Sequence, residues 1–287
     1  MAGSGLIAIK RRIKSINNTK KITKAIGLVA TSKLKKAREI LEVNNAYYNK
    51  MREIVRQTIK DAQDPNNIYI KGNNSNKKLY IAITSDAGLC GGYNSKVVSK
   101  TVESLNKDKE NSMLIIVGQK GRAYFKKYKF ESIAEFVEME EIPTVKEASV
   151  ILDKALDLYF NEKIGEINVV YTEFFSAVKQ EVKVKRIIPF DLEDINRDFT
   201  DNGVAEFEPK LKSIENEIYS LFLKAALINY MITSRTSENA SKMTAMDGAT
   251  KNADDLLEKL NLKYNRIRQS IITQEISEIV GGAEAQK

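Results

Sequence analysis

The chain of 287 residues contains no histidine, no tryptophan and a single cysteine, Cys90. Histidine is the commonest general base and the commonest transition-metal ligand, so its absence removes the usual route to a hydrolytic or metal-dependent active site. One cysteine excludes an intrachain disulfide and a thiolate metal cluster, which fits a reducing compartment. The composition favours a mechanical or binding protein over an enzyme, with no catalytic residue, no metal and no cofactor.

Long apolar runs are absent as well. No stretch approaches the roughly 20 apolar residues that span a bilayer. The N-terminus, MAGSGLIAIKRR, lacks the apolar core of a signal peptide. We therefore expect a soluble chain, made and used in the cytoplasm, that can still dock on a membrane complex through other subunits.

Acidic residues are missing from one long N-terminal stretch. Between Lys10 and Arg38 the chain has eleven Lys and Arg and no Asp or Glu, within a net charge of +8. Such a basic block seeks an acidic partner, which can be nucleic acid, anionic lipid or an acidic protein surface.

Proline is confined to the middle of the chain, at positions 65, 143, 189 and 209. Because proline is costly inside a helix, the two proline-free ends are candidates for long helices. The C-terminal end carries apolar residues at alternating steps of three and four, a stripe that weakens through Arg235, Asn239 and Lys242. The members of this stripe are Leu211, Ile214, Ile218, Leu221, Ala225, Ile228, Ile232, Met246, Ala249, Ala253, Leu256, Leu260, Tyr264, Ile267 and Ile271.

The N-terminal end has a rougher stripe of the same kind. Its members are Ile9, Ile13, Ile16, Ile22, Ile26, Val29, Leu34, Ala37, Leu41, Tyr48, Met51 and Val55. Neither helix can bury its stripe alone, so the simplest arrangement pairs the two ends antiparallel. Small residues would permit close approach of the helices: Gly27, Ala30, Ala37, Ala249 and Ala253.

The middle of the chain alternates strand-like and helix-like segments, which indicates a mostly parallel α/β sheet. Strands are expected at 78–84, 112–118 and 166–174, with an edge strand at 179–190 and helices near 94–106, 119–128 and 144–160. The polar segments 61–78 and 194–209 read as linkers. The expected division is an N-terminal coiled-coil helix at 1–60, a Rossmann-like domain at 77–205 and a C-terminal coiled-coil helix at 210–287.

A glycine-rich loop, TSDAGLCGGYN (84–94), follows the first strand. Clustered backbone amides before a helix can hold a phosphate, and Asn94 or Ser95 could cap such a helix. The spacing G-x-x-G-G matches neither common phosphate-binding pattern, so a structural turn is favoured. Cys90 has no histidine to activate it as a nucleophile, and Asp86 has no obvious carboxylate partner.

Four stretches, taken in order, carry a resemblance. INNTKKITKAIGLVATSKLKKA (16–37), the loop 84–94, MTAMDGATKNA (243–253) and RIRQSIITQEISEIVGGAEA (266–285) together resemble the gamma subunit of F-type ATP synthases. The last stretch matches the family's C-terminal signature at Ile272, Thr273, Glu275, Glu278, Gly282, Ala283 and Ala285. The resemblance spans essentially the whole chain. The lack of an inserted cysteine pair and of a presequence favours a bacterial member, at the cytoplasmic face of the cell membrane.

The resemblance implies a rotating shaft. Its fold would be an antiparallel coiled coil of the N- and C-terminal helices with a central Rossmann-like α/β domain. One copy would turn inside three alpha and three beta subunits, while its foot binds the epsilon subunit and the ring of c subunits. It would couple ion flow to conformational changes at the beta sites, with no catalytic residue and no direct lipid insertion of its own.

The resemblance also implies contact residues. Arg268, Gln269, Thr273 and Glu275 match positions that hydrogen-bond to a loop of beta, and the apolar tip would sit in a sleeve of alpha and beta. Ile26 stands where the family usually has methionine. The basic residues expected to face acidic loops of beta are Lys20, Lys21, Lys24, Lys33, Lys35 and Lys36. A solvated helix face is the alternative for both sets.

Two other interpretations remain open at this stage. A coiled-coil nucleic-acid-binding protein would explain the basic block, although that block has no aromatic residues for stacking on bases. A nucleotide-binding α/β enzyme would use the loop at 84–96.

Overall fold

The computed structural model describes residues 2–62, 64–196 and 211–284. The chain divides into two compact units. The first joins Met1–Ala30 to Met243–Lys287, and the second is Thr31–Lys242. The three-part division expected from the sequence stays a prediction.

Two long helices contribute to both units, α1 (Ala2–Ala62) and α7 (Glu215–Glu284). Neither contains a proline, and helix formers dominate both, so no residue forces an interruption. The long terminal helices expected from the sequence are therefore present.

Within the first unit the two helices run antiparallel. Thr23 and Thr250 share a hydrogen bond of 2.8 Å, and Lys20, three residues earlier in α1, pairs with Asp254, four residues later in α7. A Cβ built on Gly27 would lie 3.4 Å from the Cβ of Met246. Of the small residues expected at the interface, Ala30 and Ala253 are buried in this unit and Ala37 is buried in the second unit.

The predicted stripes were wrong at several positions. Ile22, Val29 and Leu256 are exposed, whereas Ala30 and Leu257 are buried. Close approach of the helices selects small side chains for the seam, so the bulkier neighbours point outward.

The second unit contains a sheet of five strands in the order β3-β2-β1-β4-β5. The strands are β1 (Lys78–Ile83), β2 (Ser112–Val117), β3 (Ala134–Phe136), β4 (Glu166–Phe174) and β5 (Gln180–Ile188). All pairs are parallel except β4 with β5. The sequence predicted four of these strands and missed β3, whose three residues are too few to show a period.

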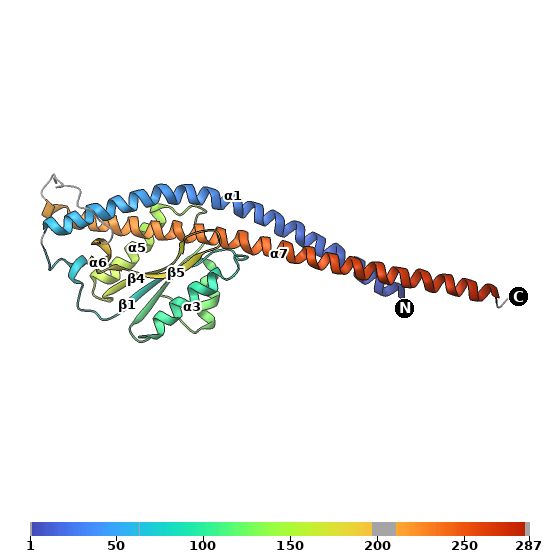
Figure 1. Cartoon of the computed structure of the whole chain (residues 1–287). Helices are drawn as coiled ribbons and strands as arrows, with labels where there is room; N and C mark the ends of the chain where they lie inside the picture. The colour runs from blue at the N-terminus through green and yellow to red at the C-terminus, as the bar shows by residue number, and fades with distance from the viewer. Residues whose placement is uncertain (1, 63, 197–210, 285–287) are drawn as a thin grey trace. The chain divides into compact units, whose positions relative to one another are not determined.

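Helices cover both faces of this sheet (Figure 1). One face packs on α3 (Tyr93–Asn106) and α4 (Gln119–Lys127), and the other on α5 (Val145–Phe160), α1 and α7. Short helical segments complete the unit: α2 (Ile68–Lys71), α6 (Leu192–Asn196) and a 3-10 turn at Leu211–Ser213. The expected Rossmann-like domain with long terminal helices is confirmed.

Helix α7 is enclosed in this unit because α1 lies on one side of it and the sheet on the other (Figure 1). Tyr230 stacks on Tyr171 of β4 with ring centroids 4.4 Å apart, and its hydroxyl lies 3.4 Å from that of Tyr48 on α1. Every residue from 222 to 234 is buried except the half-buried Lys224, whereas Leu221, expected in the seam, is exposed. A single stripe therefore underestimates what this part of the helix buries.

The first predicted linker holds more structure than its polarity indicates. It contains α2, capped by the Asn67 side chain, and α2 places Tyr69 against Phe190 and Tyr219 in the core. The second predicted linker, 194–209, lies mostly outside the described residues.

Candidate functional site

The glycine loop after β1 is a pinned turn. Helix α3 begins at Tyr93 with Gly92 as its N-cap, so Asn94 is not the cap that the sequence suggested. Its side chain turns inward, where its oxygen accepts from the Ser85 N–H at 2.9 Å and its nitrogen donates to Ser85 Oγ at 2.7 Å. Leu89 and Gly91 both have positive φ angles, of 65° and 55°. The backbone N–H groups at the two ends of the loop bond within the turn, Ser85 to the Asn94 side chain and Tyr93 to the Cys90 carbonyl at 3.2 Å.

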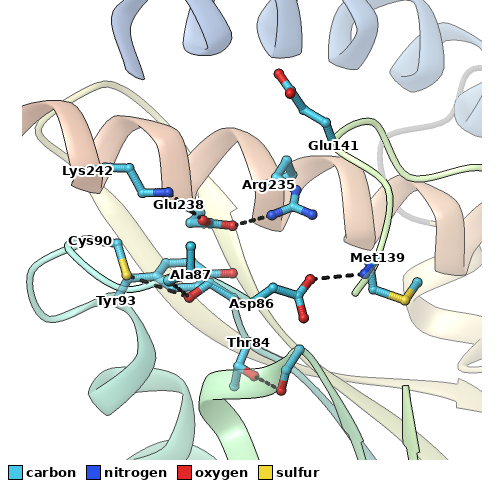
Figure 2. A network of polar contacts seen from close by, with 12 residues as sticks. Thr84, Asp86, Ala87, Cys90, Tyr93, Met139, Glu141, Arg235, Glu238 and Lys242 are labelled. Carbon is cyan, nitrogen blue, oxygen red and sulfur yellow. Dashed lines mark hydrogen bonds and ion pairs between the residues drawn. The ribbon is translucent and has the colours of Figure 1, made fainter. Parts of the chain in front are cut away.

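Cys90 lies inside this turn (Figure 2). Its sulfur is 3.3 Å from the Asn94 amide nitrogen and 3.8 Å from Ser85 Oγ. Burial raises the pKa of the thiol, which keeps it protonated near neutral pH. A nucleophile needs the opposite shift, so the side chain is a packing element.

Asp86 occupies the place where an anionic ligand would bind. Its carboxylate accepts from the backbone N–H of Met139 at 3.1 Å (Figure 2). It also accepts from the backbone N–H of Gln119 at 2.9 Å and of Glu138 at 3.0 Å. Gln119 is the first residue of α4, and such a helix N-terminus is the usual seat of a phosphate. The protein's own carboxylate therefore occupies the position of a phosphate, and its hydrogen bonds connect the end of β1 to the segment after β3.

The crevice at the carboxyl ends of β1 and β4 is also filled. In doubly wound sheets, ligands bind where the strand order reverses, which here is between these two strands. Ser234 of α7 accepts from the Thr172 N–H at 3.2 Å, and Ser237 donates to the Thr172 carbonyl at 3.0 Å. A cavity of about 20 Å³ remains beside Asp86 and Tyr93, room for a water molecule and not for a nucleotide.

A cluster of charges on α7 closes the same region (Figure 2). The carboxylate of Glu238, whose side chain is 4% exposed, lies 2.8 Å from Arg235 and 3.0 Å from Lys242. Arg235 also donates to the Glu140 carbonyl at 2.9 Å. The sequence showed this cluster only as a weak point in an apolar stripe. Opposite charges three and four positions apart were the signal that polar contacts replace apolar ones here.

The four tip residues implied by the resemblance all lie exposed on α7 in the first unit. At about 100° per residue, Arg268 and Glu275 fall on one line of the helix and Gln269 and Thr273 on a second line, about 100° to 140° around. Thr273 donates its hydroxyl to the Gln269 carbonyl at 2.9 Å, so its oxygen keeps an accepting lone pair for a partner. These positions form two polar edges of one helix face.

An exposed apolar line runs between those two polar edges. It consists of Ile272, Ile276, Ile279 and Val280, which are between 44% and 72% exposed. Ile267 and Ile271 instead lie half-buried on another side of the helix. All residues from 272 to 283 are exposed, and Ala285 of the C-terminal signature lies outside the described residues. Four neighbouring aliphatic side chains left open to water mark a contact surface.

The six predicted lysines fall into two groups. Lys20 pairs with Asp254, and Lys33 Nζ lies 2.8 Å from Glu141, whose pKa this contact lowers. The other four have no ion pair among the residues that the structure describes, and all are exposed: Lys21, Lys24, Lys35 and Lys36. Ile26 is half-buried. Two members of the set thus have partners inside the chain, which the sequence did not reveal.

Among the described residues, no helix is long and apolar enough to cross a membrane.

A sequence model described as ATP synthase matches residues 5–286. A protein of Clostridium novyi named ATP synthase gamma chain is 62% identical over 287 residues, which is 100% of both chains.

The chain belongs to the ATP synthase gamma chain family.

Another member of the gamma chain family, from Clostridium pasteurianum, is 53% identical over 99% of both chains. The fold is similar to a chain in the cryo-EM structure of the Euglena gracilis mitochondrial ATP synthase, OSCP/F1/c-ring, with a TM-score of 0.70 and 17% identity over 99% of this chain and 95% of that one. The resemblance drawn from the sequence is confirmed. As a gamma chain family member, this protein is a non-catalytic rotor subunit of an ATP synthase.

Proposed function

We propose that one copy of this chain forms the central shaft of a bacterial F-type ATP synthase, turning inside three alpha and three beta subunits. Its lower end would bind the epsilon subunit and the ring of c subunits. Rotation of that ring by ion flow would turn the shaft, and the shaft would change the conformations of the beta sites in sequence. The chain supplies shape and contacts, and the bond chemistry takes place in beta.

The coupling rests on differential contact. A ligand or partner shifts a conformational equilibrium only by the difference in its affinity for the two states. A shaft with unlike faces offers each beta subunit a different surface at any one angle. The faces described here are unlike, since the tip of α7 is apolar with polar edges and α1 is basic.

The exposed apolar line at the tip of α7 is the observation that carries this proposal. Ile276 and Ile279 are 56% and 72% exposed, with no covering element among the described residues. An apolar sleeve formed by alpha and beta would bury them without strong directional bonds, which suits a surface that must slide. Arg268, Gln269, Thr273 and Glu275, on the two polar edges, would form hydrogen bonds with a loop of beta at particular angles.

The basic residues would meet acidic loops of beta. Lys21, Lys24, Lys35 and Lys36 are the stronger candidates because their ammonium groups are not already paired within the described chain. Lys20 and Lys33 would have to exchange an internal carboxylate for an external one. Ile26, on the same helix, would contact beta through its exposed part.

The location follows from the assembly. The chain would sit at the cytoplasmic face of the cell membrane, held there by the c ring and epsilon, without inserting into lipid itself.

The test uses the assembled complex. Ile276→Asp combined with Ile279→Asp places two charges in the apolar sleeve, and ATP hydrolysis by the purified complex should fall at least tenfold. Val150→Asp is the matched control, because Val150 is an exposed apolar residue on α5, outside the shaft, at 52% exposure. The proposal fails if both variants assemble and hydrolyse ATP at the parental rate.

A further inference from the structure

Helix α4 carries charge of one sign only. Residues 119–130, which are α4 and the three residues after it, contain five basic residues and no Asp or Glu: Lys120, Arg122, Lys126, Lys127 and Lys129. Helix α5 on the other face of the sheet mixes both signs, as solvated helices generally do. Like charges on one short helix repel one another, so this face is poorly explained as a solvated surface.

A cleft of about 880 Å³ lies along α4 beside β3, the strand at the edge of the sheet. We call it the α4 cleft. Ile116, at 1% exposure, is buried beneath the cleft, and the half-buried ring of Phe130 gives it an apolar floor. Lys120, Lys126 and Lys129 are exposed and line its rim. The α4 cleft therefore combines an apolar floor with a positively charged rim.

The lysines of the rim are available to a partner. Glu135 is held by Arg122 at 2.5 Å and by the Ser132 hydroxyl at 2.8 Å, so it is committed. Glu131 is the one other carboxylate in the lining. Lys120, Lys126 and Lys129 have no ion pair among the described residues. Three cations thus face a single carboxylate, which leaves the rim positive.

We propose that the α4 cleft docks an acidic segment of another protein, one with an aliphatic or aromatic side chain between carboxylates. The apolar side chain would cover Phe130, and the carboxylates would pair with the rim lysines. Aromatic side chains such as Phe130 are among the types enriched in such interfaces.

The shape of the site favours a protein segment over the other anionic partners. A membrane surface is flat and cannot reach the floor of a concave cleft. Nucleic acid would bring phosphates to the lysines but no aliphatic group for Phe130. The α4 cleft uses none of the shaft residues, so this inference stands or falls independently of the rotor function.

The experiment measures binding of a defined probe to the full chain. The probe is a fluorescent nine-residue peptide with four glutamates on each side of a central leucine, followed by anisotropy at low and moderate salt. Lys120→Gln with Lys126→Gln and Lys129→Gln should weaken binding at least tenfold. Replacing the leucine of the probe by glycine should weaken binding to the parent at least threefold.

The matched control changes three exposed lysines elsewhere in the same unit, Lys146→Gln, Lys154→Gln and Lys163→Gln. Lys146 and Lys154 lie on α5 and Lys163 follows it, and their replacement should alter affinity less than twofold. Phosphatidylserine vesicles and a single-stranded oligonucleotide are the competing probes. The proposal is overturned if the α4 variant binds the peptide as the parent does. It is also overturned if glycine replaces leucine without loss, or if either competing probe binds in an α4-dependent way while the peptide does not.

Discussion

The hydroxyl of Ser234 accepts a hydrogen bond from the backbone N–H of Thr172, at 3.2 Å. This contact joins the C-terminal helix to the strand end where a nucleotide would sit in a related fold. Together with the Ser237 hydroxyl at 3.0 Å from the Thr172 carbonyl, it makes α7 the occupant of that crevice. The carboxyl end of the sheet therefore holds helix α7 in the place where a related fold would hold a nucleotide.

Removing both hydroxyls should loosen this attachment. Ser234→Ala with Ser237→Ala leaves the buried N–H and carbonyl of Thr172 unpaired, which should lower the free energy of unfolding by about 2 kcal/mol. Urea unfolding of the purified chain measures the change. Ser241→Ala, on the same helix α7, is the control. It removes a partly buried hydrogen bond to the Gln180 side chain of β5 and should cost less than half as much. Equal losses in the two variants would mean that the Thr172 contacts have no special weight.

Closure of the crevice has a second consequence. The isolated chain should bind neither ATP nor ADP, since Asp86 occupies the amide of Gln119 and α7 fills the switch point. Isothermal titration calorimetry with each nucleotide should show only heats of dilution. Saturable binding that is lost on Asp86→Ala would contradict the interpretation of this loop.

The buried carboxylate of Glu238 balances two cations. Glu238→Gln would leave Arg235 and Lys242 close together with little water, so the free energy of unfolding should fall by about 3 kcal/mol. Adding Lys242→Met to that variant should recover part of the loss. Glu217→Gln, an exposed position on the same helix, should have almost no effect. A small effect of Glu238→Gln would show that solvent already screens the cluster.

Alkaline pH should destabilise the second unit through its buried tyrosines. Burial raises the pKa of Tyr159 to about 12 from the ordinary value near 10. A raised folded-state pKa gives stability that is complete below pH 10 and declines from pH 10 towards 12, by up to about 1.4 kcal/mol per pH unit for each such tyrosine. Tyr159→Phe removes the hydrogen bond from the tyrosine hydroxyl to the Ile68 carbonyl. It also removes the hydroxyl that titrates, so the variant escapes this alkaline loss of stability.

The measurement compares urea unfolding of parent and Tyr159→Phe at pH 8 and pH 11. The difference in free energy of unfolding between the parent and Tyr159→Phe should be smaller at pH 11 than at pH 8. Tyr128→Phe, at an exposed position, should give no such change. If this difference is the same at both pH values, groups other than Tyr159 cause the loss of stability at alkaline pH.

Much of the fold could be predicted because its signals are local. The placement of proline and the apolar periods located α1, α7 and four of the five strands. What failed depends on contacts between distant segments. The seam of the first unit is chosen by close approach of Gly27 to Met246, which no stripe within one helix reveals. Tyr69, in a polar segment, is buried only because Phe190 and Tyr219 lie beside it.

The candidate site could likewise be predicted where its signal is local in the sequence, and not where it depends on contacts between distant segments. The exposed tip around Gln269 and Thr273 could be found because its motif is continuous in the sequence. The pairing of Lys33 with Glu141 joins residues 108 positions apart, so the lysine looked as available as its neighbours. Asp86 likewise finds its three amide donors on segments after β2 and β3, and its lack of a nearby carboxylate partner was uninformative.

The half-buried Ile26 offers a test of coupling on α1. Ile26→Lys adds a cation where the shaft would face acidic loops of beta, so the complex should assemble normally but yield less ATP per translocated ion. Membrane vesicles carrying the variant complex measure ATP yield against ion uptake. Ile26→Met, the residue usual in the family, should match the parent. Equal yields in the lysine variant and the parent would refute the assignment.

Rotation of this chain within its complex is the most direct test of the rotor function. Val178→Cys, at the 88% exposed tip of the β4–β5 turn, gives a labelling site, because the native Cys90 is buried. With the alpha and beta subunits fixed to a surface, a gold particle on this cysteine should turn in one direction during ATP hydrolysis, in three steps per revolution. A particle that stays still while the same complexes hydrolyse ATP would contradict the account.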